Sequence, residues 1–282
     1  MTSALSAARV AQYRSDGYLS PLPALSAAEA GENLARLEAI ERSEGGKLSH
    51  ATNQKPHLLY PWLAELVRRP EILDPVASVI GPDILLWGCG FFAKNPNDGK
   101  IVSWHQDSTY WGLSEPEIIT AWVAFTPSTR PAGCMRVVPR THTTDQLPHV
   151  DTHADNNLLS RGQEVAVDVD DRDAVDIVLA PGQMSLHHVR IIHGSDVNHA
   201  PHRRVGLALR YIPTRIRQTA GSEDSATLVR GEDRFGHFLP EPRPSRDLDP
   251  DCVAFHRGVV DRSTRILYRG AAQGPEGRQA AM

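Results

Sequence analysis

The chain has 282 residues, of which 40% are hydrophobic, and its 30 Lys and Arg against 34 Asp and Glu give a formal net charge of −4. A hydrophobic fraction of this size suffices for the core of one large domain. The slightly acidic balance argues against nucleic acid as a partner. The sequence also lacks an apolar run near the ~18 residues that span a bilayer, so we expect no membrane association.

Three cysteines bear on the location of the protein: Cys89, Cys134 and Cys252. Their odd number and wide spacing do not fit a disulfide framework. The first residues are a mixed polar stretch without the apolar segment of a signal peptide. We therefore expect a reducing, cytoplasmic location.

Helical patterns dominate residues 1–80. Ser26 stands three residues before Glu29, which is the pattern of a capping box at the start of a helix. Apolar residues recur at helical spacing in three segments between residues 34 and 80, and Gly81-Pro82 ends the last of them. We expect these helices to buttress a sheet.

From residue 84 to residue 213 the pattern changes to short apolar runs separated by Gly and Pro turns. We predict strands at residues 84–87, 91–92, 104–107, 118–125, 134–138, 164–169, 176–179, 184–188 and 203–212. About eight strands without interleaved helices predict two sheets in a jelly roll, the architecture of cupins. The fold class is therefore mainly β, with flanking N-terminal and C-terminal helices.

Two further segments complete the expected organisation. The polar segment 140–163 is expected to be a loop over the mouth of the barrel, and residues 214–282 to be a loop followed by a helix at about 250–268, capped by Asp249. We thus predict a single domain over residues 1–282, made of a helical buttress (1–80), a jelly-roll core (84–213) and this C-terminal region (214–282).

The first chemical signal is the pair His105 and Asp107. Side chains i and i+2 of a strand leave the same face, so these two are expected to point together while Gln106 points away. With His193 as a second imidazole they would form the triad of two histidines and one carboxylate that holds non-haem Fe(II) and leaves three positions open. His-x-Asp alone is a weak signal, and its alternative is a surface strand pair.

The residues downstream of His193 favour the metal site. Ser195 follows two positions later, and Arg204 follows eleven positions later on the predicted strand 203–212. Alternation puts Arg204 on one face with the small residues Gly206 and Ala208, which leaves room for a ligand. Because the guanidinium pairs bidentately with a carboxylate, Arg204 suits a dicarboxylate that chelates iron, and Ser195 can add a hydroxyl donor. The alternative is that Arg204 pairs with a structural acid.

Taken together, these residues resemble the phytanoyl-CoA dioxygenase family of Fe(II)/2-oxoglutarate-dependent oxygenases. The resemblance covers most of residues 15–270 and is densest at 84–142 and 180–213. The elements that carry it are Lys94-x-Pro96, His105-Gln106-Asp107, Ala121-Trp122-x-Ala124, Gly133-Cys134-x-x-Val137-x-Pro139-x-Thr141-His142, Pro181-Gly182, and His193-Gly194-Ser195-x-x-Asn198 with Arg204.

The resemblance implies a double-stranded β-helix with iron on His105, Asp107 and His193. It also implies a reaction in which O2 and 2-oxoglutarate are consumed, an unactivated C–H bond of a small molecule is hydroxylated, and succinate and CO2 are released. Such an enzyme leaves the difficult chemistry to iron and the cosubstrate, while the protein supplies geometry and a dry site.

The resemblance further implies the residues that contact 2-oxoglutarate. Arg204 and Ser195 would hold it, and Trp122 and Gln106 would line its pocket. The family's turn before Thr141 usually has glycine where this chain has Arg140, which bears on the shape of that loop.

Several basic and imidazole side chains stay open at this point. The lysine that human-type enzymes offer to 2-oxoglutarate has no secure counterpart, and the candidates are Lys47, Lys55 and Lys94. The cluster Arg210, Arg215 and Arg217 fits either a solvated face or an anionic substrate. His188 is predicted to support the metal site and His187 to pack in the core.

Three classes of function remain. The favoured one is a 2-oxoglutarate-dependent hydroxylase, and the same cofactor set also serves desaturation or oxidative cyclisation in secondary metabolism. The second class is a cupin-like metal enzyme that does not use 2-oxoglutarate, and the third is a binding protein; Arg204 and Ser195 argue against the second and the intact triad against the third. Related halogenases have Ala or Gly in place of the carboxylate, so Asp107 favours hydroxylation. The sequence names neither the substrate nor the oligomeric state.

Overall fold

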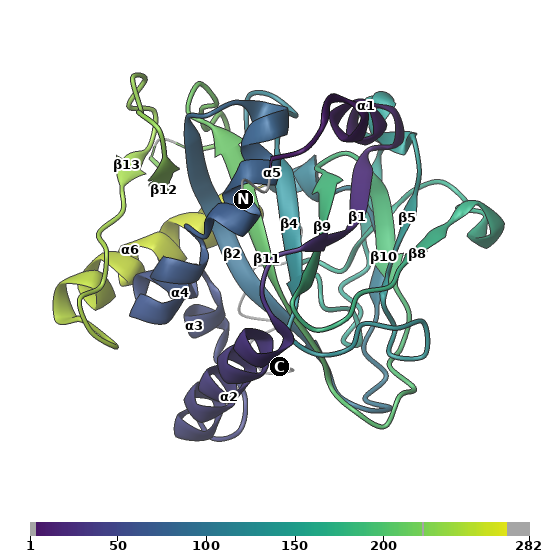
Figure 1. Cartoon of the computed structure of the whole chain (residues 1–282), viewed down its shortest axis with the longest axis horizontal. Coiled ribbons are helices and arrows are strands. Elements are labelled where there is room, and N and C mark those ends of the chain that lie inside the picture. Colours follow the sequence, from purple (N-terminus) through teal and green to yellow (C-terminus); the bar gives the residue numbers. More distant parts are fainter. Residues whose placement is uncertain (1–3, 222, 270–282) are drawn as a thin grey trace.

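The computed structural model describes residues 4–221 and 223–269 (Figure 1). Its helices are α1 (Ala7–Asp16), α2 (Ala27–Ser43), α3 (His50–Asn53), α4 (Pro61–Leu66), α5 (Pro70–Ile80) and α6 (Pro250–Leu267). Four short 3-10 turns are η1 (Pro56–Leu58), η2 (Asp107–Tyr110), η3 (Thr141–Thr143) and η4 (Asp171–Asp173). The strands are β1 (Tyr18–Pro23), β2 (Ile84–Lys94), β3 (Val102–His105), β4 (Ile119–Ala124), β5 (Met135–Val138), β6 (His149–Asp151), β7 (Gln163–Val165), β8 (Val175–Ile177), β9 (Gln183–His188), β10 (Ile192–Ser195), β11 (Arg204–Pro213), β12 (Ser225–Arg230) and β13 (Leu239–Pro240).

Two sheets make up the core of the fold. The larger sheet has the strand order β1-β9-β4-β11-β2-β12-β13, and the smaller one has the order β3-β10-β5-β8. Neighbouring strands are antiparallel in both sheets except for the short parallel pair β12–β13. This arrangement is the predicted jelly roll, or double-stranded β-helix, and it leaves one face of each sheet toward a shared interior.

The N-terminal helices cover the outer face of the larger sheet (Figure 1). Leu37 of α2, Leu63 of α4 and Val76 of α5 belong to the same buried cluster as Leu207 and Leu209 of β11. Alternation along β11 sends these two leucines outward to the helices and leaves the other face for the interior. The prediction that helices buttress a sheet is confirmed for this region, and the capping box at the start of α2 is present.

Several strands lie in segments for which a helix or loop was predicted, and β1 and β12 are the longest of them. β1, inside the region predicted to be helical, pairs with β9 at the edge of the larger sheet. Its two prolines, Pro21 and Pro23, obscure the strand pattern, and an edge strand tolerates them because one side needs no ladder hydrogen bonds. β12, in the region expected to be a loop, extends the sheet beyond β2.

The remaining predicted boundaries need smaller corrections. Residues 84–87 and 91–92 belong to one continuous strand, β2, and the polar segment 140–163 carries η3, β6 and the start of β7. The final helix begins at Pro250 with Asp249 accepting from the Asp251 amide, as predicted. Residues 270–282 of the expected C-terminal region lie outside the described residues.

A buried ionic cluster attaches the C-terminal strands to the N-terminal half. The Lys55 ammonium donates to a Glu241 carboxylate oxygen at 2.7 Å and to the Ser225 carbonyl at 2.6 Å. His57 lies 3.1 Å from the other Glu241 oxygen through Nε2 and 3.1 Å from the Cys89 sulfur through Nδ1. The Glu241 side chain has no exposed surface, so its charge depends on these partners.

Two further predictions concerned disulfide bonds and membrane spans. Cys89, Cys134 and Cys252 are all buried free thiols, so no disulfide links them. Within residues 4–221 and 223–269, no helix has the length and apolar character needed to cross a bilayer.

Candidate active site

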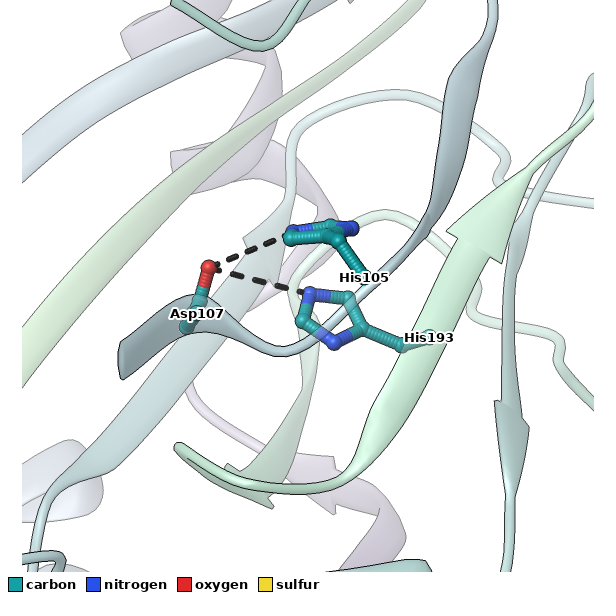
Figure 2. Close-up of side chains that lie close together, drawn as sticks. All are labelled: His105, Asp107 and His193. Atoms are coloured by element: carbon teal, nitrogen blue, oxygen red, sulfur yellow. Dashed lines mark ion pairs between the residues drawn. The ribbon is translucent and has the colours of Figure 1, made fainter. Parts of the chain in front are cut away.

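The structure brings His105, Asp107 and His193 together between the two sheets (Figure 2). His105 ends β3 and His193 lies directly opposite on β10. One Asp107 carboxylate oxygen lies 3.3 Å from His105 Nε2 and 3.9 Å from His193 Nε2. One ligand atom from each of the three side chains lies within 4.8 Å of the others, which suits a single ion.

Asp107 reaches this position by a different route from the one predicted. β3 ends at His105, and Asp107 opens the 3-10 turn η2 instead of continuing the strand. Its amide donates to the Val189 carbonyl at 3.0 Å, which fixes the turn. The expectation that strand alternation aligns the two side chains was therefore wrong, although the turn brings them together all the same.

Backbone carbonyls set the tautomers of both histidines. His105 Nδ1 lies 2.9 Å from the Ser103 carbonyl, and His193 Nδ1 lies 3.0 Å from the Ile191 carbonyl. A carbonyl oxygen only accepts hydrogen bonds, so each Nδ1 carries the proton and each Nε2 presents its lone pair toward Asp107. This is the outer support that metal-binding histidines require.

The electrostatics favour the ligand forms of these groups at neutral pH. Burial would raise the pKa of Asp107, but the neighbouring His105, His193 and Arg210 outweigh burial and hold this pKa well below its usual range. Burial, reinforced by His105, lowers the pKa of His193 well below 6.5, so the imidazole stays neutral. A carboxylate and neutral imidazoles are the donors that a divalent metal needs, and the residues therefore fit Fe(II).

A cavity with an empty volume of about 430 Å³, its open mouth included, extends from the triad between the sheets. Its apolar lining comes from Phe92, Val102, Trp122, Met135, Leu159 and Ala208. Its polar lining beyond the triad comes from Thr120, His187, Ser195, Arg204 and Arg210. A mostly apolar cavity with a few convergent polar groups is typical of a small-molecule site.

Arg204 occupies one end of this cavity beside Trp122. Its guanidinium carbon lies 4.4 Å from the centre of the Trp122 ring, and its Nε donates to the Ser128 hydroxyl at 3.2 Å. Burial lowers the pKa of Arg204 to about 10, so the group stays charged at neutral pH. Gly206 makes room for this packing, because a Cβ there would collide with the Trp122 ring.

No acid neutralises Arg204 among the described residues, since no carboxylate there lies within ion-pair distance of it. The alternative that Arg204 pairs with a structural acid is therefore not met in this part of the chain. A buried, unpaired guanidinium is costly to maintain without a ligand. Arg204 is therefore available to bind an anion.

Lys94, one of the three lysine candidates from the sequence, supports the same end of the cavity. Its ammonium donates to the Ser195 hydroxyl and to the Asp196 carbonyl, both at 2.6 Å. Burial, followed by the charge of Arg204, lowers the pKa of Lys94 to about 7. The other two lysine candidates lie elsewhere, since Lys47 is exposed and Lys55 binds Glu241.

Gln106 does not reach the cavity, contrary to what the resemblance implied. Its amide nitrogen donates to the Arg190 carbonyl at 2.8 Å, and its amide oxygen accepts from the Leu147 amide at 2.8 Å. Gln106 therefore fastens the segment after η3 to the loop before β10. Arg140 starts that segment in the left-handed conformation, with φ of 70°, which is the conformation that the family's usual glycine adopts without steric cost.

His187 and His188 lie in positions opposite to those predicted: His187 is at the site and His188 is away from it. His187 lines the cavity, with Nε2 at 4.0 Å from an Asp107 oxygen, and burial lowers the pKa of His187 to about 4. His188 points away and packs on the His142 ring at 5.1 Å between centres. The register across β4 and β9 decides this, because β9 alternates faces and His187 stands opposite the cavity residue Thr120.

Comparisons with known proteins agree with this geometry. A family model described as phytanoyl-CoA dioxygenase (PhyH) matches residues 4–206. A curated relative, the probable alpha-ketoglutarate-dependent hypophosphite dioxygenase of Stutzerimonas stutzeri, is 29% identical over 162 residues, which are 56% of this chain and 55% of the relative. The chain spans about half the length of the curated relatives it matches.

Two solved structures extend the likeness over almost the whole chain. The non-heme monooxygenase ThoJ is 37% identical with a TM-score of 0.82, over 92% of this chain and 97% of ThoJ. CytC3, solved with Fe(II) and alpha-ketoglutarate, is 26% identical with a TM-score of 0.65, over 88% of this chain and 97% of CytC3. With the family model matching well over half of its residues, the chain belongs to the phytanoyl-CoA dioxygenase family of Fe(II)/2-oxoglutarate-dependent oxygenases.

Proposed function

We propose that this protein hydroxylates an unactivated C–H bond of a small molecule, with Fe(II) held by His105, Asp107 and His193. The carrying observation is that these side chains converge in a cavity between the sheets, with both imidazoles presenting Nε2 to one point. Bound Fe(II) supplies activation of O2 at the expense of 2-oxoglutarate, which leaves as succinate and CO2. The protein's part is to bind, orient and exclude water.

The far carboxylate of 2-oxoglutarate is proposed to bind Arg204 and Ser195. The Lys94 ammonium occupies the Ser195 oxygen as an acceptor, so the hydroxyl proton of Ser195 is free to be donated to a ligand. Trp122 packs against the guanidinium of Arg204 and fixes its plane. The geometry thus supports a site for a dicarboxylate with one end on Arg204 and the other at the metal.

Replacing Arg204 by alanine is expected to weaken 2-oxoglutarate binding. A charge-assisted bidentate bond is worth about 1.5–3 kcal/mol, which corresponds to a ~10- to 150-fold higher 2-oxoglutarate midpoint. The measurement is a titration of 2-oxoglutarate under nitrogen with Fe(II) present. Arg203→Ala is the matched control, because Arg203 pairs with Glu41 outside the cavity. Equal midpoints in the two variants would mean that the cosubstrate is held elsewhere.

The reaction outcome is tested by product analysis in chloride. With Asp107 present, three protein groups hold the metal, so we expect the wild type to add one oxygen atom to its substrate even at high chloride. A product lacking two hydrogens and carrying no oxygen would favour desaturation or oxidative cyclisation by the same cofactor set. Chlorinated product from the wild type would contradict the hydroxylase proposal.

The Asp107→Gly variant tests the ligand itself. It removes a ligand and a negative charge, so we expect most hydroxylation to be lost, with chlorination a less favoured outcome because the rest of the site is arranged around a carboxylate. Mass spectrometry of the products of both proteins, after a screen of small polar metabolites, is the measurement. Undiminished hydroxylation in Asp107→Gly would show that Asp107 does not bind the metal.

Three further proposals concern the partners, the location and the cofactor of the protein. The site accepts a small molecule, and the net charge of −4 supports no nucleic acid partner. The free state of Cys89, Cys134 and Cys252 supports the cytoplasm as the location. A metal enzyme without 2-oxoglutarate is disfavoured, because such an enzyme has no use for the unpaired Arg204.

A further inference from the structure

A second arginine faces the cavity from the same strand as Arg204. Arg210 lies six residues further along β11 and lines the cavity together with Thr120 and His187. The register of the larger sheet explains this grouping, because Arg210 stands opposite Thr120 of β4, and Thr120 stands opposite His187 of β9. The three side chains form one polar row across the sheet, beside the triad carboxylate.

Arg210 has no anionic partner among the described residues. None of their carboxylates forms an ion pair with it, and its buried Nε has no hydrogen-bond acceptor. The guanidinium carbon instead lies 5.3 Å from the centre of the Trp111 ring and 6.0 Å from that of Phe92. Two aromatic rings hold the group in place but give its Nε no acceptor.

Arg210 differs in this respect from Arg215, the next arginine in the sequence. Arg215 forms ion pairs with Glu115 and Glu117 at the surface, and its side chain is 40% exposed. The charge of Arg210 helps to lower the pKa of Asp107, but no ion pair joins the two side chains, and Asp107 belongs to the proposed metal site. A buried guanidinium donor without an acceptor, in a cavity that can admit a ligand, therefore indicates a site for an anion.

We propose that Arg210 binds an acidic group of the substrate, a carboxylate or a similar oxyanion. This rests on the proposed function, in which Arg204 and the metal already take the two ends of 2-oxoglutarate. The lining of the same cavity also includes the apolar side chains of Val102, Met135 and Leu159. The substrate class is thus a small acid whose remaining surface is largely apolar, held with its anionic group on Arg210 and a C–H bond at the metal.

The test compares acids with their uncharged amides. Protein loaded with Mn(II) and saturating 2-oxoglutarate under nitrogen is titrated with 3-phenylpropionate and hexanoate, and then with 3-phenylpropanamide and hexanamide, by calorimetry and thermal shift. We expect the acids to bind at least ~10-fold more tightly than the amides, as the loss of a charge-assisted hydrogen bond requires. Arg210→Gln should remove this difference and leave the affinity for 2-oxoglutarate unchanged.

Two further variants separate the effect of the Arg210 guanidinium from a general effect of charge. Arg215→Gln is the matched control, because it removes the same charge five residues away and outside the cavity. Arg210→Lys keeps the charge but not the planar fork, and it should retain part of the preference for acids. The wild-type comparison of acid with amide needs no variant and holds even if a substitution at Arg210 disturbs folding.

The outcomes separate this proposal from the proposed function. Acids that bind no better than amides, or that do not bind at all while 2-oxoglutarate does, would overturn the role of Arg210. Weakened 2-oxoglutarate binding in Arg210→Gln would assign the arginine to the cosubstrate's near carboxylate instead, and would overturn it too. Failure of the wild type to bind 2-oxoglutarate with Mn(II) would contradict the proposed function itself and remove the basis of this inference.

Discussion

Alanine in place of His105 or His193 is expected to weaken Fe(II) binding ~100-fold or more and to abolish succinate formation. Loss of a group that only supports a ligand already costs 10–100-fold, so loss of a ligand costs at least ~100-fold. Both imidazoles are small parts of the buried interior, and their strands keep all backbone pairing, so the fold should remain. The measurements are an anaerobic Fe(II) titration, succinate analysis and circular dichroism.

His199→Gln is the control for these two variants. His199 lies six residues past His193, is exposed, and contacts Asn97 outside the cavity. It should bind Fe(II) like the wild type. Normal Fe(II) affinity in His105→Ala or His193→Ala would mean that the three side chains do not form the metal site.

Glutamine in place of Glu241 is expected to lower the free energy of unfolding by about 3–5 kcal/mol. The change leaves the buried Lys55 ammonium without its counter-ion, and an uncompensated buried charge costs about this much. Burial alone would raise the pKa of Glu241, but Lys55 and His57 outweigh burial and lower this pKa below its ordinary 4.5. The stabilisation should therefore be complete above about pH 4.5 and be lost as the pH falls further.

Urea denaturation of the variant and of a surface control measures this effect. Glu232→Gln breaks an exposed ion pair with Arg234 and should cost no more than about 1 kcal/mol. Adding Lys55→Met to Glu241→Gln should restore part of the loss, because the unpaired charge is then gone. A cost for Glu241→Gln equal to that of the surface control would show that the cluster does not attach β12 and β13 to the rest of the chain.

The residues of the candidate metal site could be predicted because their signals are local. His105 and Asp107 are two residues apart, and His193 is marked by the glycine, serine and arginine that follow it. The route by which Asp107 reaches the site could not be predicted, since the end of β3 at His105 depends on pairing with β10. The direction of Gln106 likewise depends on a carbonyl 84 residues away.

Arg210 shows a signal that was available but not followed. Alternation through Arg204, Gly206 and Ala208 continues to Arg210, which predicts the same cavity face. Grouping it with Arg215 and Arg217 as one basic cluster hid this, because sequence proximity alone does not say where a strand ends. The strands β1 and β12 were missed for a related reason, since both owe their place to pairing at or near the edges of the larger sheet.

The central claim is that one cavity holds Fe(II) on the triad and 2-oxoglutarate on Arg204. The most direct test is a calorimetric titration of 2-oxoglutarate into the wild-type protein under nitrogen, with and without Fe(II). We predict one molecule of 2-oxoglutarate bound per chain when Fe(II) is present, and binding that is strongly reduced without the metal or in His193→Ala. Binding of equal strength with and without Fe(II), or no binding at all when Fe(II) is present, would contradict the account.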